Sequence, residues 1–222
     1  MSDFDTLIHG MAVTPYGQTE VSIGVVEGQI AAIGSKVKGK AKETLHVKDG
    51  LILPGFIDAH VHFNEPGRTD WEGFETGSSA IAAGGATTFF DMPLNSSPPV
   101  LDRTSFEEKR RIGEQKSRVD FALWGGLTPD SLDHLEGMAE AGAIGFKAFM
   151  CPSGLDEFGA ADASVLKRGM RIAAKVGLPV AVHAEDPDVI TKHQAAHPCP
   201  SPGTMADWLD SRPVAAELSA IR

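Results

Sequence analysis

Apolar and polar residues follow two different patterns along this 222-residue chain, and the change comes near residue 51. Before it, short β-prone segments such as 5–9, 21–26 and 29–33 are separated by turn signals rich in Pro and Gly, which is typical of antiparallel strands. So few strands are too small to be stable alone. The pattern predicts a small β unit over residues 1–52 that needs a partner sheet.

From residue 51 onward, β-prone and helical patterns alternate. The expected strands are 51–63, 86–92, 119–127, 144–150 and 178–183, and the expected helices are 71–83, 103–115, 130–141 and 163–176. Thr128 is a plausible N-cap for the third helix, because Pro129 follows it at the first helical position. Alternation of this kind predicts a parallel sheet, either doubly wound or closed into a barrel.

The length of the second region limits the architecture. An eight-stranded TIM barrel alone takes about 250 residues, and only five strands are expected here. The residues 214–221 are helix-like and no helix-stop signal follows them. We therefore expect a truncated chain that holds about five of eight barrel strands over residues 53–222.

Composition and charge exclude several classes of partner. The chain is 42% hydrophobic and 23% charged, as globular proteins are, with no stretch long enough for a membrane span and no secretory signal at its start. A net charge of -10 argues against nucleic acid and anionic membranes as partners. Cys151 and Cys199 are too few for a disulfide framework. We expect a soluble, cytoplasmic protein.

Two histidines follow the apolar run 51–57, in the sequence Asp58-Ala59-His60-Val61-His62. Side chains two apart on a strand share a face, so His60 and His62 are expected to project together from the end of a buried strand. Two converging imidazoles can hold a divalent metal ion. A chain with eight histidines can also contain such a pair by chance, so a core role for both stays open at this point.

Lys147 lies inside the apolar stretch 144–150. Its side chain either extends to water past the strand end or is buried, which lowers its pKa and leaves a free amine that can form a carbamate with carbon dioxide. His183 ends the strand 178–183, and ligands of α/β folds gather at the carboxyl ends of parallel strands. His60, His62, Lys147 and His183 all fall at such ends, on three strands.

Five stretches in the chain resemble the cyclic amidohydrolases, the family of dihydroorotase, hydantoinase and allantoinase. They are 54–67, 83–88, 91–99, 145–150 and 182–185, and they follow one another in the family's order. The resemblance implies a partial (β/α)8 barrel of the metal-dependent amidohydrolase type, preceded by the N-terminal strands of a small β-sandwich. It also implies that the complete enzyme is a homo-oligomer, with a tetramer expected.

The resemblance further implies a binuclear metal site. His60 and His62 would bind one ion, carboxylated Lys147 would bridge, and His183 would bind the second ion. Zn²⁺ is the expected metal, although imidazole and carboxylate ligands suit other transition metals as well. The family's further metal-binding His and its catalytic Asp have no counterpart in this chain. Asp58 and Asp91 are expected to orient neighbouring ligands.

Asn64 stands where dihydroorotases carry an Arg that holds the substrate carboxylate. An amide can bond a neutral ureide but cannot supply a charge-assisted, bidentate pair. The run 64–75 also resembles allantoinases, so the expected reaction is hydrolytic opening of the hydantoin ring of allantoin to allantoate. Asn64, Asn95 and Ser153 are expected to contact the substrate, although turn chemistry also explains the last two.

Three alternatives remain open at this point. Arg68 could take over the role of the dihydroorotase arginine, which keeps that activity as an alternative beside dihydropyrimidinase or hydantoinase. A metal-free assembly module is the alternative outside enzymes. His193 and His197 could share a helix face, but Pro198 beside them favours loop histidines.

Overall fold

The structure is a computed structural model that describes residues 2–198 and 203–222. It divides the chain into two compact units, Met1–Gly55 and Phe56–Arg222. Cys199 lies outside the described residues. None of the helices in the described ranges is both long enough and apolar enough to cross a membrane.

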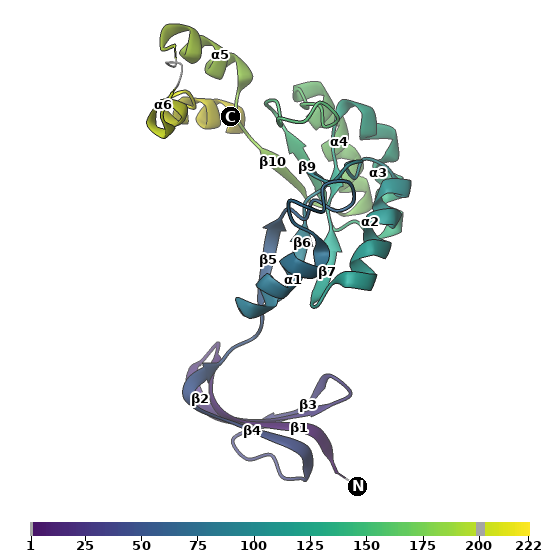
Figure 1. Cartoon of the computed structure of the whole chain (residues 1–222), viewed down its shortest axis with the longest axis vertical. Helices are drawn as coiled ribbons and strands as arrows, with labels where there is room; N and C mark the ends of the chain where they lie inside the picture. The colour runs from purple at the N-terminus through teal and green to yellow at the C-terminus, as the bar shows by residue number, and fades with distance from the viewer. Residues whose placement is uncertain (1, 199–202) are drawn as a thin grey trace. The chain divides into compact units, whose positions relative to one another are not determined.

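The first unit is a four-stranded sheet. Its strands are β1 (Phe4–Thr14), β2 (Gly17–Val26), β3 (Gln29–Gly34) and β4 (Ala41–Ile52), in the order β3-β2-β1-β4 (Figure 1). The predicted antiparallel pairing of the first three strands is confirmed. Strand β4 runs parallel to β1 and was not predicted, because its first half carries mostly polar side chains.

The second unit alternates strands and helices, so the predicted α/β class is confirmed. Its strands are β5 (Phe56–Val61), β6 (Ala86–Asp91), β7 (Asp120–Leu123), β8 (Gly125–Gly126), β9 (Phe146–Phe149) and β10 (Val180–His183). Its helices are α1 (Phe74–Ala83), α2 (Arg103–Lys116), the 3-10 helix η1 (Pro129–His134), α3 (Leu135–Ala141), α4 (Ala163–Val176), α5 (Pro187–Ala196), α6 (Met205–Asp210) and α7 (Val214–Ile221).

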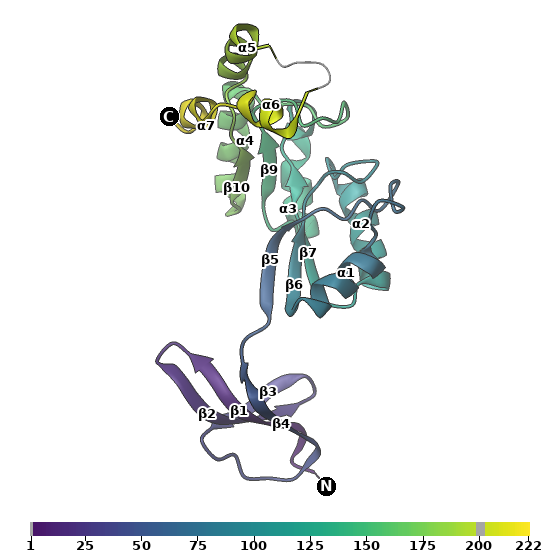
Figure 2. The ribbon, with the colours of Figure 1, turned by 60° about the vertical axis from the view of Figure 1, so that its left-hand side comes forward.

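The strands of this unit form two parallel three-stranded sheets, β5-β6-β7 and β8-β9-β10. Helices α2, α3 and α4 lie along one side of these strands (Figures 1 and 2). His60, His62 and His183 lie at or just after the carboxyl ends of β5 and β10, and Asp91 ends β6. Lys147 is the second of the four residues of β9, so the prediction that it lies at a strand end is wrong. The parallel arrangement predicted from the sequence is confirmed.

Two predicted strands differ from the observed ones. The expected strand 51–63 is divided between β4 and β5 by Pro54, which has no N–H for a sheet ladder. The prediction that this strand is buried is wrong, because Phe56 is 58% and Ile57 62% exposed in the edge strand β5. The expected strand 119–127 is divided at Trp124 between the two sheets.

The start of the third helix follows the predicted signal but takes a different form. Thr128 is its N-cap and Pro129 its first residue, as predicted. The Thr128 amide donates to Ser131 Oγ at 2.9 Å. The first turns form the 3-10 helix η1 before α3 begins at Leu135, so only the helical type was missed.

An aromatic cluster supports the ends of β5 and β6. The Phe63 ring lies 4.8 Å from that of Phe89 and 5.5 Å from that of Phe74, centroid to centroid. All three side chains are buried, and such edge or tilted pairs add to the free energy that burial provides. The cluster fixes the segment that carries His62 against α1 and β6.

Candidate metal centre

His60 and His62 lie at the end of β5, with ring centroids 5.3 Å apart. His62 Nδ1 lies 2.6 Å from the carbonyl oxygen of Leu94. A carbonyl only accepts, so Nδ1 carries the proton and Nε2 keeps its lone pair. Burial, followed by the nearby charges of Lys147 and His62, lowers the pKa of His60. Burial therefore favours the neutral, metal-binding form of His60.

Lys147 lies in β9 and is 5% exposed. Among residues 2–198 and 203–222 it forms no ion pair, whereas the other buried lysine, Lys109, is paired with Asp91. Burial lowers the pKa of Lys147, since water no longer stabilises the ammonium form. The interpretation of a buried side chain is confirmed over that of a side chain extended to water.

His183 ends β10, the strand that pairs with β9, and stands opposite Phe149 in the register. The rings of His183 and Phe149 stack at 4.8 Å with an interplanar angle of 10°. A cavity of about 460 Å³ is lined by His60, Lys147 and His183, together with Glu185. The structure thus brings three of the four predicted ligands to one cavity, and the fourth, His62, lies beside His60.

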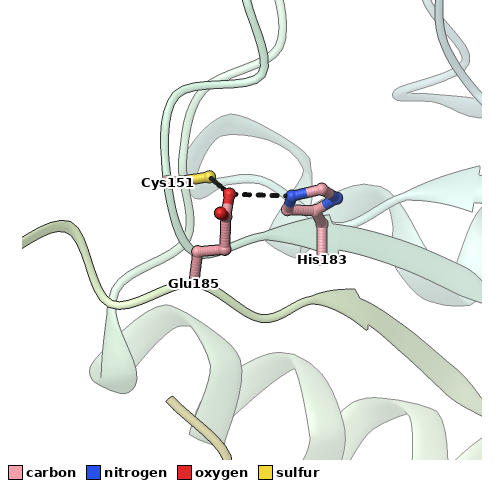
Figure 3. A group of neighbouring side chains, drawn as sticks. All are labelled: Cys151, His183 and Glu185. Atoms are coloured by element: carbon pink, nitrogen blue, oxygen red, sulfur yellow. Dashed lines mark hydrogen bonds and ion pairs between the residues drawn. The ribbon is translucent and has the colours of Figure 1, made fainter. Parts of the chain in front are cut away.

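Glu185 is a site residue that the sequence analysis missed. One of its oxygens, Oε2, lies 3.0 Å from His183 Nε2, 2.9 Å from Arg212 Nη1 and 3.4 Å from Cys151 Sγ. Figure 3 shows this oxygen between the thiol and the imidazole. Burial alone would raise the pKa of Glu185, but the bonds from His183 and Cys151 and the charge of Arg212 outweigh it and lower that pKa.

A signal for Glu185 exists in the sequence, since a carboxylate two residues after a strand-end histidine is a common orienting partner. Arg212 gave no such signal. It lies between α6 and α7, 27 residues from Glu185 in the chain. Cys151 is buried, and burial raises the pKa of its thiol.

Asp91 ends β6 and takes part in a buried clamp on Phe63, the residue after His62. Its Oδ1 accepts from the Phe63 amide at 2.8 Å, and Lys109 Nζ donates to the Phe63 carbonyl at 2.9 Å. Lys109 Nζ and Asp91 Oδ2 are 2.9 Å apart, with side chains 1% and 0% exposed. Burial raises the pKa of Asp91, although Lys109 and the Phe63 amide oppose this.

The two predicted orienting carboxylates act through the backbone. Asp91 holds the Phe63 amide, and Asp58 Oδ1 accepts from the His60 amide at 3.1 Å. Within the described residues, neither carboxylate forms a hydrogen bond to an imidazole of the predicted ligand set. Their contribution is therefore to fix the main chain on either side of His62.

The predicted substrate residues lie in different environments. Asn64 is buried, and its Oδ1 has no hydrogen-bond partner in the described part of the chain. The Asn95 carbonyl accepts from Arg68 Nη1 at 2.6 Å. The Ser153 hydroxyl donates to the Phe158 carbonyl at 2.8 Å within its own loop. Contact of these three residues with substrate stays a prediction.

The histidines outside the matching motifs do not line the candidate metal cavity in the described part of the chain. His193 is in the last turn of α5, and its Nε2 lies 2.8 Å from the Asp210 carbonyl. His197 is the C-cap residue of that helix, with its ring stacked on that of His193 at 4.5 Å. His9 and His46 stack on adjacent strands of the first unit.

Comparison with known proteins places the chain in a family. The model of the amidohydrolase family matches residues 51–212. The chain belongs to the amidohydrolase family. Members of this family are typically metal-dependent, which agrees with the histidine and lysine donors around the cavity.

Named amidohydrolases resemble the chain over its whole length. It is 52% identical to an allantoinase of Deinococcus radiodurans, in an alignment that covers 98% of this chain and 49% of the relative. It is 49% identical to an allantoinase of Solibacter usitatus, in an alignment that covers 96% of this chain and 46% of that relative. The solved structure of an L-hydantoinase (dihydropyrimidinase) from Arthrobacter aurescens superimposes with a TM-score of 0.91 at 33% identity, over 98% of this chain and 49% of that one. The chain spans about half the length of the relatives it matches.

Proposed function

We propose that this chain carries the first half of the active site of an allantoinase, which opens the hydantoin ring of allantoin to allantoate by hydrolysis. The observation that carries the proposal is the position of buried Lys147, which has no ion-pair partner in the part of the chain that the structure describes, beside His60 and His183 in one cavity. The allantoinases that match the chain at 49–52% identity support the choice of reaction. The five βα units would be the first part of an eight-stranded barrel.

The donor set fits a pair of divalent ions. His60 and His62 would bind one ion and His183 the other, with a carbamate on Lys147 between them; nitrogen and carboxylate-type oxygen donors suit Zn²⁺. To form the carbamate, the neutral Nζ of Lys147 adds to the carbon of CO₂ and loses a proton, which gives an N–COO⁻ group. Burial favours this step because it lowers the pKa of the amine.

When bound, two such ions would supply Lewis-acid chemistry: they would lower the pKa of water towards neutrality and would polarise the ring carbonyl. The chain's own residues hold the donors in place. The Leu94 carbonyl keeps the proton of His62 on Nδ1, and Phe149 fixes the plane of the His183 ring. The proton for the leaving nitrogen would come from the half of the barrel beyond these strands.

The environment of Arg68 favours a neutral substrate over a carboxylate. Its guanidinium pairs with Glu157 at 2.9 Å and bonds the Asn95 carbonyl at 2.6 Å. An arginine engaged in this way does not supply a free charge to dihydroorotate. The buried, unpartnered Oδ1 of Asn64 fits the N–H groups of a ureide such as allantoin, since a buried acceptor without a donor is costly.

A second candidate is dihydropyrimidinase or hydantoinase activity, because the L-hydantoinase fold superimposes with a TM-score of 0.91. The three ring substrates are separated by kcat/KM values for allantoin, dihydroorotate and hydantoin, measured on the complete gene product that carries this chain. We expect allantoin to be preferred. Preference for either of the other rings would overturn the choice of substrate.

Metal analysis of the same protein distinguishes a metal-dependent enzyme from a metal-free assembly module. We expect about two transition-metal ions per chain in the wild type, with loss of bound metal in Lys147→Met. Lys175→Met is the matched control, because Lys175 is 71% exposed and paired with Glu136 on the surface. A wild type without metal and without turnover of any of the three rings would favour the assembly module.

A further inference from the structure

Glu185 connects the candidate metal centre to a chain segment that contributes no predicted ligand. The Glu185 side chain is 13% exposed, and its Oε2 meets His183 Nε2 at 3.0 Å and Arg212 Nη1 at 2.9 Å. Arg212 lies between α6 and α7, whereas Glu185 follows β10 directly. The guanidinium therefore anchors the carboxylate that faces the histidine.

The contact with Glu185 decides which nitrogen of His183 is free. An ionised carboxylate only accepts hydrogen bonds, so Nε2 must carry a proton in this arrangement. In a neutral imidazole the lone pair is then on Nδ1 alone. A metal ion can bind His183 through Nδ1 without displacing Glu185, but not through Nε2.

Stacking and the ion pair restrict the imidazole in two independent ways. Phe149, opposite His183 in the β9–β10 register, stacks on the ring at 4.8 Å with 10° between the planes. Stacking fixes the ring plane but leaves a half-turn of the ring free, because both faces stack equally well. The bond to Glu185 removes that freedom, since only one of the two orientations points Nε2–H at the carboxylate.

An alternative is that these residues bind a metal ion themselves. Cys151 Sγ, a ring nitrogen of His183 and a carboxylate oxygen of Glu185 lie within 4.8 Å of one another (Figure 3). However, Arg212 Nη1 lies 2.9 Å from Glu185 Oε2 and 4.0 Å from Cys151 Sγ. The guanidinium is always charged and repels a divalent ion there, so the geometry favours an ion-pair network.

We propose that Glu185, anchored by Arg212, is a positioning residue that keeps His183 in the tautomer and orientation that present Nδ1 to the metal ion. This role rests on the proposed function, because it requires His183 to be a ligand. Removing an orienting partner of a ligand typically weakens metal affinity by about 10–100-fold. Glu185→Met is expected to show that loss, and Arg212→Met is expected to show a smaller one.

The test uses metal affinity rather than turnover, measured on the complete gene product by competition with a chromophoric chelator for Zn²⁺. Glu185→Gln keeps an oxygen that accepts from Nε2–H and is expected to retain affinity within about threefold, against the loss of about 10–100-fold in Glu185→Met. Glu217→Gln is the matched control, because Glu217 lines the same cavity but, within the described residues, forms no hydrogen bond or ion pair with His183. An equal loss in Glu217→Gln would mean that cavity charge alone sets affinity, and would overturn the proposal.

A second measurement reports the tautomer itself. Histidine ¹⁵N spectra of the metal-free protein, with the His183 signals identified by their absence in His183→Asn, are expected to show the Nε2–H form in the wild type and mixed forms in Glu185→Met. Unchanged spectra and unchanged Zn²⁺ affinity in Glu185→Met would overturn the role of Glu185 and leave the proposed function intact. A wild type that binds no divalent ion would instead contradict the proposed function.

A thiolate–Cd²⁺ absorption band that Cys151→Ser abolishes would identify a metal site at Cys151 and overturn the ion-pair network.

Discussion

The buried pair of Asp91 and Lys109 leads to a quantitative prediction. Lys109→Met preserves most of the side-chain volume but removes the ammonium that lies 2.9 Å from Asp91 Oδ2 and 2.9 Å from the Phe63 carbonyl. The carboxyl group of Asp91 then lacks its cation in a site where both side chains are at most 1% exposed. Removing one partner of such a buried pair costs about 3–5 kcal/mol of unfolding free energy.

Urea denaturation of the wild type and the variants measures this cost. The control is Lys175→Met, because Lys175 and Glu136 lie 2.8 Å apart but are 71% and 51% exposed, and exposed pairs contribute about 0–1 kcal/mol. The double variant Asp91→Asn with Lys109→Met should lose less than the sum of the single variants, by at least about 1 kcal/mol. A loss in Lys109→Met no larger than that in Lys175→Met would refute the argument that burial makes the clamp strong.

Three further predictions concern stability and reactivity. The hydrogen bond from the Ser105 amide is the main cause that lowers the pKa of Asp102, the N-cap of α2, below its usual 3.8. Asp102→Ala should therefore lower the free energy of unfolding by about 0.5–2 kcal/mol at neutral pH. In urea titrations, this difference in unfolding free energy between wild type and variant should narrow as the pH falls below 3.8, because the wild-type protein then loses the stabilisation. A gap that widens in acid would contradict this sign. Because burial raises the pKa of Cys151, its alkylation in a Cys199→Ser background should be slow in native protein and fast in urea, and equal rates in both would be inconsistent with the burial. Gly77→Ala should destabilise the protein by about 1–3 kcal/mol despite the better helix propensity of Ala, because the added Cβ meets the Phe63 ring; a gain in thermal stability would show that α1 moves aside at little cost.

The alternation of strands and helices was predictable because each element bears its own local signal. Thr128 and Pro129 mark the start of a helix in the sequence, and they do so in the structure. The division of the predicted strand 51–63 is also a local matter, since Pro54 was visible in it. The exposure of Phe56 and Ile57 was not predictable, because edge position depends on which strands pair.

The candidate site was predictable where a motif carries it and not elsewhere. His60, His62 and His183 lie at or just after strand ends and Lys147 lies within β9, and neighbouring parallel strands bring such positions together by topology. Glu185 and Arg212 meet only because the segment between α6 and α7 returns to β10, and no local pattern encodes that return. The clamp of Lys109 on Phe63 was missed for the same reason, since a lysine on a helix is usually a surface residue.

Anomalous X-ray diffraction from crystals of the complete gene product, grown with Zn²⁺, tests the central claim most directly. We predict two metal peaks within bonding distance of the imidazoles of His60, His62 and His183, with continuous density for a carboxyl group on Lys147 Nζ between them. An unmodified Lys147 amine with no metal peak beside these histidines would contradict the account.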